Sequence, residues 1–237
     1  MTPALRIISS MATKQLLADL IDLYKQAQQQ ANPPLQVPET ELVSAGGVDA
    51  AKRVQAGEAF DIVALASNAI DQLISAGKVV GGSRVDMVKS GVAVAIQTGT
   101  THPDISSEAA VREAVLAAPT VGYSTGPSGV QLAKLFERWG IAAKIQSRIV
   151  TAPSGIPVAS LIAKGDVALG FQQLSELVNQ SGIEVLGPLP PAIQITTTFS
   201  TGLAATSVQP DAARALMAFF ASPETVETKR RNGMEAA

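Results

Sequence analysis

The sequence predicts an α/β fold in which mainly parallel strands are flanked by helices. Short apolar runs alternate with amphipathic helical stretches along the whole chain of 237 residues, and this alternation is typical of strand–helix–strand units with right-handed crossovers. The composition is that of a globular protein, because 46% of the residues are hydrophobic and only 16% are charged. A chain of this length forms one large domain or two modest ones.

The first elements are the most regular. Residues 5–8 form an apolar run, and residues 14–30 repeat apolar side chains at helical spacing until Asn32-Pro33-Pro34 interrupts the pattern. The next segments are predicted as a strand at 41–44, a helix at 48–56, a buried strand at 60–66 and a helix at 69–76, which Gly77 closes.

The same alternation continues to the end of the chain. The strands are predicted at 92–96, 120–122, 144–150, 167–171, 183–186 and 196–205. The helices are predicted at 109–116, 130–139, 157–163, 174–178, 211–220 and 223–231. Ser106-Ser107-Glu108 precedes the first of these helices and has the residue types of an N-terminal cap.

Turns rich in serine and glycine recur where helices are predicted to begin. They are Ser9–Thr13, Ser44–Gly47, Ser67-Asn68, Ser124–Gly129 and Pro153–Gly155. Such a turn offers unpaired backbone N–H groups, a hydroxyl group and the positive end of a helix dipole. Ligands of parallel sheets bind beyond the carboxyl ends of the strands. The turns therefore predict a site for an anion or polar ligand that is assembled from helix N-termini.

The composition argues against several classes of function. The formal net charge is −2 with no long run of either sign, so no nucleic-acid partner is expected. The chain has no cysteine and one histidine, His102, in a Pro-bounded loop. Thiol catalysis, iron–sulfur clusters, multi-histidine metal sites and a Ser-His-Asp triad are therefore not expected. Because no carboxylates are spaced for acid–base chemistry either, we expect no catalytic residues, no metal, no cofactor and no enzyme activity.

Six segments, in their order and spacing, carry a resemblance to a known family. They are Leu5–Ser10 with the helix after it, Gly57–Val63, Ile74–Val79, Leu135–Ile141, Ala163–Gly170 and Ala215–Glu224. Together they resemble the type II periplasmic solute-binding proteins of ABC importers, in the molybdate-binding-protein-like branch. The resemblance extends over nearly the whole chain.

The resemblance implies a two-lobed type II periplasmic-binding-protein-like fold. Lobe one would hold residues 1–86 and 200–237, and lobe two residues 87–199, with crossover strands at 87–97 and 193–201. The implied function is that of an extracytoplasmic solute-binding protein, which captures a small anion between the lobes and delivers it, as a monomer, to an ABC transporter membrane permease. No basic segment followed by an apolar one begins the chain, and no run approaches the roughly 20 apolar residues that span a bilayer. A periplasmic protein whose signal peptide is absent from this chain is expected, with a cytoplasmic location as the alternative.

This chain departs from the family pattern at three places, and these departures change the ligand that we expect. Where molybdate binders carry hydroxyl groups and a tyrosine, this chain has Ala12, Gly46-Gly47 and Gln173. Molybdate accepts hydrogen bonds only, whereas a glutamine amide also offers an acceptor. An organic carboxylate is therefore favoured, with molybdate or tungstate as one alternative. A ligand-sensing domain of a transcription regulator, which shares the two-lobed architecture, is a second alternative. An enzyme built on the same lobes, which would turn over the bound molecule, is a third.

The candidate ligand-binding residues come from the five turns, the first crossover and the end of a lobe-two strand. They are Ser9, Ser10, Met11, Gly46, Gly47, Ser67, Lys89, Thr125, Ser128, Gly129, Ser154, Gly155 and Gln173. Lys89, together with Arg84 and Arg148, is a candidate for neutralising a bound anion. Ser10 and Gln173 are expected to grip one ligand from opposite lobes.

Overall fold

The computed structural model describes residues 3–31, 33, 38–153 and 155–237. The chain divides into two compact units, of which unit 1 is Met1–Lys89 with Thr198–Ala237 and unit 2 is Ser90–Thr197. It passes from unit 1 to unit 2 within strand β4 (Val85–Gln97) and returns within strand β9 (Thr196–Leu203). The lobe boundaries predicted from the sequence, at 86/87 and 199/200, stay a prediction.

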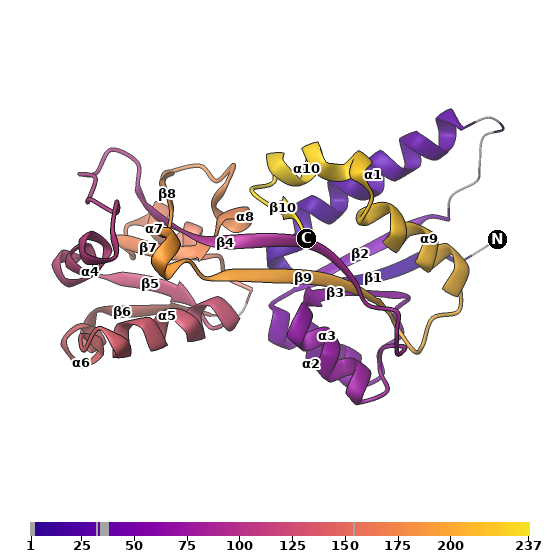
Figure 1. Ribbon diagram of the computed structural model, residues 1–237, viewed down its shortest axis with the longest axis horizontal. Coiled ribbons are helices and arrows are strands. Elements are labelled where there is room, and N and C mark those ends of the chain that lie inside the picture. Colours follow the sequence, from indigo (N-terminus) through magenta and orange to yellow (C-terminus); the bar gives the residue numbers. More distant parts are fainter. Residues whose placement is uncertain (1–2, 32, 34–37, 154) are drawn as a thin grey trace. The chain divides into compact units, whose positions relative to one another are not determined.

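Unit 1 is built on a sheet of parallel strands with helices on both faces (Figure 1). Strand β1 (Leu5–Ser10) lies between β2 (Thr40–Ala45) and β3 (Ile62–Ala66) and is parallel to both. Strand β9 is antiparallel to β3, and the short β10 (Glu235–Ala236) is antiparallel to β4. One face is covered by α1 (Lys14–Gln30), α9 (Pro210–Phe220) and α10 (Val226–Arg231), and the other by α2 (Gly47–Gln55) and α3 (Ser67–Ser75).

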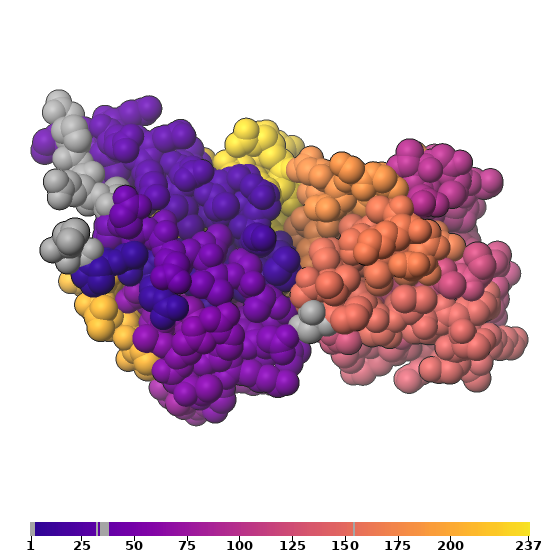
Figure 2. Space-filling view, turned by 180° about the vertical axis from the view of Figure 1, so that it is seen from behind, coloured from indigo at the N-terminus to yellow at the C-terminus, as the bar shows by residue number. Residues whose placement is uncertain are grey.

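The burial of β1 explains why three of its first four residues are apolar. Leu5 and Ile7 enter the core below α1 and α9, whereas Ile8 enters the core below α2 and α3. Alternate residues of a strand point to opposite faces, so a strand covered on both faces carries adjacent apolar residues such as Ile7 and Ile8. Figure 2 shows unit 1 from behind, where its N-terminal segments form most of the visible surface and the yellow C-terminal segment lies beside them.

Unit 2 repeats this plan with a different strand order. Strand β5 (Val121–Ser124) is parallel to β6 (Ile149–Ala152) and β7 (Leu169–Gln173), and β7 and β8 (Ile183–Pro188) are antiparallel to β4. A core around Phe136 packs α4 (Glu108–Ala117), α5 (Pro127–Arg138) and α6 (Ala142–Ile145) against one face. On the other face lie α7 (Val158–Lys164) and α8 (Leu174–Leu177). Short 3-10 turns occupy Met11–Thr13, Gln146–Arg148, Pro191–Ile193 and Pro223–Thr225.

The strand predicted at 144–150 is wrong. Residues up to Arg148 form α6 and a 3-10 turn, and the strand begins only at Ile149. Ile141 and Ile145 are both buried in the core of unit 2, and a spacing of four residues is that of one helix face. The apolar residues of this segment fit the helical period, which the alternating interpretation of the sequence missed.

Within the described residues, no helix is long and apolar enough to cross a membrane.

Candidate ligand-binding site

Three helical segments begin at the same edge of the unit 1 sheet. Strands β1, β2 and β3 run in parallel, so their carboxyl ends share one edge, and each is followed at once by a helical turn. The N-cap residues are Ser10, Gly46 and Ala66, and none of them makes a capping hydrogen bond with its side chain. The first-turn N–H groups of all three therefore lack the usual N-cap acceptor.

Ser10 lies beside the starts of two of these helical segments. It ends β1, its hydroxyl oxygen is 3.3 Å from Oγ1 of Thr13, and Met11 follows it in the first helical turn. A side chain built on Gly47 would lie 3.8 Å from the Cβ atom of Ser10, so α2 also begins beside this serine. Ser9 differs, because it is wholly buried and its hydroxyl lies 2.7 Å from that of Ser44 on β2.

The hydroxyl group of Ser67 is used inside unit 1. Its oxygen lies 2.6 Å from the Ser200 hydroxyl oxygen and 3.0 Å from the Thr198 carbonyl oxygen. The Ser200 hydroxyl donates to Asp86, whose pKa is lowered by hydrogen bonds from Arg84 and Ser200. Since the single Ser200 hydrogen is used there, Ser67 donates its own hydrogen to Ser200 or Thr198. The start of α3 therefore offers backbone N–H groups, and no free hydroxyl hydrogen, to a ligand.

The start of α5 forms the corresponding edge in unit 2. Its N-cap is Gly126, with no side-chain cap; Thr125 is exposed and Ser128 is buried. A Cβ atom at Gly129 would lie 1.7 Å from the carbonyl oxygen of Ser124, so the missing side chain lets α5 approach the end of β5. The structure gives Gly129 this packing role, and its predicted contact with ligand stays a prediction.

Two other predicted residues follow β6 in unit 2. Gly155 has φ +79°, a left-handed conformation that favours glycine. Its neighbour Ser154 was also predicted to bind ligand, and it lies outside the described residues.

The end of β7 and the short α8 hold a cluster of polar side chains, Gln172, Gln173, Ser175 and Glu176, which we call the β7–α8 corner. Gln173 is 4% exposed; its Nε2 donates to Oγ1 of Thr197 at 2.7 Å, and its Oε1 has no partner. The Ser175 hydroxyl is also buried without a partner. Burial raises the pKa of the Glu176 carboxyl to about 7, and a hydrogen bond with the Gln172 side chain opposes this rise.

Two of the three cationic candidates are already engaged by other groups of the chain. Arg84 forms ion pairs of 2.8 Å with Asp71 and with Asp86. Arg148 donates to the backbone carbonyl groups of Leu116, in the last turn of α4, and of Ala118, just after this helix. Lys89 is exposed in the middle of β4, opposite Glu235 of β10. An anion at the strand ends would therefore be held by N–H and hydroxyl donors, and the described residues contain no cluster of three or more potential metal ligands.

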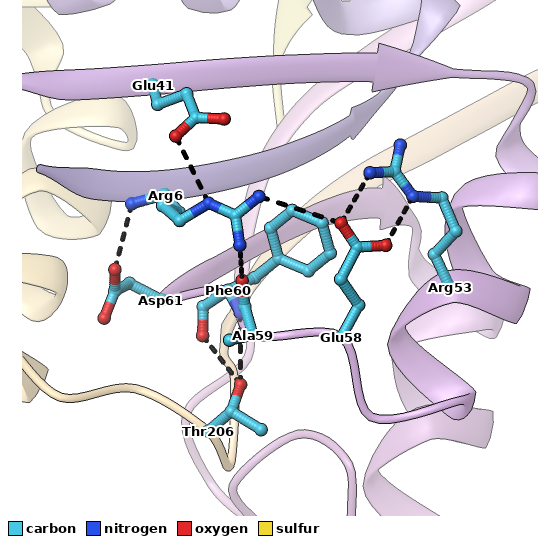
Figure 3. A network of polar contacts seen from close by, with 8 residues as sticks. All are labelled: Arg6, Glu41, Arg53, Glu58, Ala59, Phe60, Asp61 and Thr206. Atoms are coloured by element: carbon cyan, nitrogen blue, oxygen red, sulfur yellow. Dashed lines mark hydrogen bonds and ion pairs between the residues drawn. The ribbon is translucent and has the colours of Figure 1, made fainter.

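The largest charged network of unit 1 lies at the opposite, amino edge of its sheet (Figure 3). Arg53 donates twice to the Glu58 carboxylate, at 2.6 and 2.7 Å, and Arg6 lies 3.3 Å from Glu41. Both guanidinium groups lie over the Phe60 ring, 5.0 and 5.5 Å from its centre. The network fixes the starts of β1, β2 and β3, and the sequence analysis did not identify it.

The chain belongs to the bacterial extracellular solute-binding protein family, which it matches over residues 5–235. Among individual relatives, it is 35% identical over 184 residues to an aconitate isomerase from Pseudomonas sp., a match that covers 77% of this chain and 70% of that protein.

Solved structures are similar in fold at low identity. The periplasmic molybdate-binding protein of Azotobacter vinelandii is 17% identical, with a TM-score of 0.78 over 97% of this chain and 98% of that one. The sulfate-binding protein SubI of Mycobacterium tuberculosis is 14% identical, with a TM-score of 0.74 over 98% and 86%. PEB3 with bound L-phospholactate is 12% identical, with a TM-score of 0.70 over 98% and 100%. These matches confirm the predicted resemblance and the α/β type II binding-protein fold.

The expectation that the chain is not an enzyme is wrong, because the relative of 35% identity is an isomerase. The expectation rested on missing cysteine, histidine and paired-carboxylate patterns. An isomerase that moves one proton needs a single group able to accept and return it, and burial can tune a lone carboxyl for that task. Sequence spacing carries no signal for such a group.

Proposed function

We propose that this protein binds a small organic polycarboxylate and catalyses its isomerisation, with aconitate as the first candidate substrate. The observation that carries the proposal is the 35% identity to an aconitate isomerase over 77% of the chain. The family description as extracellular solute-binding proteins supports the binding half of the proposal. The same description supports a place outside the cytoplasm, and we propose that the protein acts as a monomer.

The donors at the strand ends suit carboxylate groups. Helix starts carry roughly half a positive charge, and their free N–H groups hydrogen-bond to anions. In unit 1 these are the turns at Ser10–Met11, Gly46-Gly47 and Ser67. In unit 2 they are the start of α5 and the amide of Gln173, which presents an acceptor or a donor according to its orientation. The carboxylate groups of a polycarboxylate accept hydrogen bonds from each of these N–H and hydroxyl groups.

The reaction requires one proton to move within the substrate. Aconitate carries a CH2 group beside both a carboxylate and a double bond. Removal of a CH2 proton leaves a delocalised allylic anion, and return of the proton to the far carbon shifts the double bond. The new double bond forms where the bound molecule had a single bond, and it keeps the rotation that this single bond had. The new double bond can therefore be trans where the old one was cis, so the two forms interconvert. Protons and electrons balance without an oxidant or reductant.

The test is incubation of the purified protein with cis-aconitate and, separately, with trans-aconitate. We expect each isomer to yield the other in chromatography, and deuterium from D2O to enter the substrate in NMR spectra. Ser10→Ala should reduce turnover at low substrate concentration, whereas Ser75→Ala, at an exposed site on α3, should not. If aconitate raises the melting temperature but neither isomer converts, the isomerase proposal is wrong.

A second candidate is supported by the family description: a binding protein that delivers a carboxylate or an oxyanion to an ABC transporter permease. The molybdate- and sulfate-binding structural relatives share its fold. A thermal-shift panel of aconitate isomers, citrate, molybdate, tungstate and sulfate separates the ligands, because a ligand that binds the folded state raises its melting temperature. Stabilisation by molybdate alone would favour the oxyanion alternative.

A further inference from the structure

Building on the proposed isomerase function, we propose that Glu176 in the β7–α8 corner is the catalytic residue that removes the substrate proton and returns it. The residue belongs to the same sheet edge as the predicted ligand contact Gln173, which ends β7 and is the N-cap of α8. It is enclosed but keeps partial exposure. A base that meets a substrate needs both properties, because it must be desolvated and yet reachable.

The contacts of Gln172 define how the carboxyl group is held. Oε1 of Gln172 accepts from the backbone N–H of Ala159 on α7, at 3.4 Å. The amide nitrogen is therefore the part of this side chain that remains to donate to Glu176. Because Gln172 is itself buried in β7, the carboxyl group is tied to the sheet.

Some buried polar atoms of the β7–α8 corner have no hydrogen-bond partner. Oε1 of Gln173 and Oγ of Ser175 have no hydrogen-bond partner. Buried polar atoms in folded proteins are nearly always paired, and each exception calls for an explanation. The Ser175 hydroxyl can donate to a ligand carboxylate, and the Gln173 amide can do so with its nitrogen turned to the ligand. The unpaired atoms are therefore a second and independent observation in favour of a site here.

The acidity of Glu176 fits the role. Burial raises its pKa to about 7, so near neutral pH both the carboxylate and the carboxylic acid are populated. A group with a pKa near the working pH accepts and returns a proton most effectively. An exposed glutamate, with a pKa near 4.3, would be almost entirely ionised and a weaker base.

Glu176 alone takes up the proton and returns it, so the step needs no other reactant. The Glu176 carboxylate takes a proton from the substrate CH2 group, and the C–H electron pair enters the allylic system. The resulting carboxylic acid gives the proton to the carbon at the other end of that system. The carboxylate is then restored, and the double bond has moved by one carbon.

The experiment compares Glu176→Gln and Glu176→Asp with a matched control, Glu137→Gln, which replaces an exposed glutamate on α5. For each protein, aconitate interconversion and deuterium uptake from D2O give the rate, and thermal shift with aconitate gives binding. We expect Glu176→Gln to lose roughly 100- to 10,000-fold in both rates, the usual range for general acid–base catalysis, while the thermal shift persists. Glu176→Asp should exceed Glu176→Gln in rate, because it keeps a carboxyl group, and Glu137→Gln should match the parent.

The outcomes separate this assignment from the proposed function. If the parent neither interconverts nor deuterates aconitate, the proposed function fails and the assignment fails with it. If the parent is active and Glu176→Gln keeps its rate, or if Glu176→Gln loses binding, only the assignment of Glu176 is overturned. Should Glu176→Gln fail to fold, Glu176→Asp decides: a lowered kcat at unchanged KM supports the assignment, and an unchanged kcat overturns it.

Discussion

Glu176→Gln is expected to stabilise the folded protein at alkaline pH and to leave its stability unchanged at acidic pH. Burial raises the pKa of this carboxyl from its ordinary value of 4.5 to about 7 in the folded protein. The folded state therefore binds the proton more tightly than the unfolded state does. Stability is lost as the pH rises from about 4.5 through about 7, because the buried group must then ionise. A glutamine resembles the neutral acid at every pH and avoids this loss.

The size of the effect follows from the two pKa values. One unit of pKa corresponds to about 1.36 kcal/mol, so the full difference amounts to about 3 kcal/mol in the free energy of unfolding. Below pH 4.5 the carboxyl is protonated in both states and the difference between parent and variant approaches zero. Above pH 7 the variant should reach its maximal advantage.

The assay is urea unfolding of parent and variant at intervals from pH 4 to pH 8.5, with Glu137→Gln as control. Other titrating groups are common to both proteins and cancel in the difference. The control should differ from the parent by a constant amount, since Glu137 is exposed. A difference for Glu176→Gln that stays flat across this range would refute the reasoning, because it would mean that Glu176 ionises as readily in the folded protein as in water.

Three further predictions concern other parts of the chain. Ser10→Ala should weaken binding of the carboxylate ligand by about 0.5–1.5 kcal/mol in calorimetry, with the exposed Ser75→Ala unchanged; equal affinities in all three proteins would remove Ser10 from the site. Gly129→Ala should destabilise by about 1–3 kcal/mol or more in urea unfolding, because its methyl group would overlap the Ser124 carbonyl oxygen; a neutral result would mean that α5 shifts freely. Phe60→Ala should cost about 3–5 kcal/mol, through the lost core contacts and the two guanidinium groups above its ring, and a loss below about 1 kcal/mol would contradict this.

The regular helices and the strand ends could be predicted from sequence because their signals are local. Residues 14–30 form the helix that the apolar spacing indicates, and Gln173 ends β7 near the predicted strand end. The helical structure of residues 144–148 was missed because the apolar spacing of a strand and that of a helix are hard to distinguish in so short a segment. The hydroxyl pairing of Ser9 with Ser44 depends on the register of β1 against β2, which no turn sequence encodes.

The proposed catalytic residue was missed for a different reason. Glu176 is one of many glutamates in the sequence, and neither its neighbours nor its spacing sets it apart. Its distinction comes from burial and from Gln172, four residues earlier on a strand that packs against α7. Such an environment exists only after the sheet and its helices have assembled, so a motif search cannot find it.

The position of the network around Phe60 in Figure 3 determines how substitutions in unit 1 act on the proposed site. In unit 1 the charged groups that brace the strand starts lie at one edge of the sheet, and the donors offered to a ligand lie at the other. In the proposed site, substitutions in the turns at 9–13 and 44–47 would therefore change the ligand contacts and leave this brace in place. Ligand preference and the bracing of the strand starts are thus separable in unit 1.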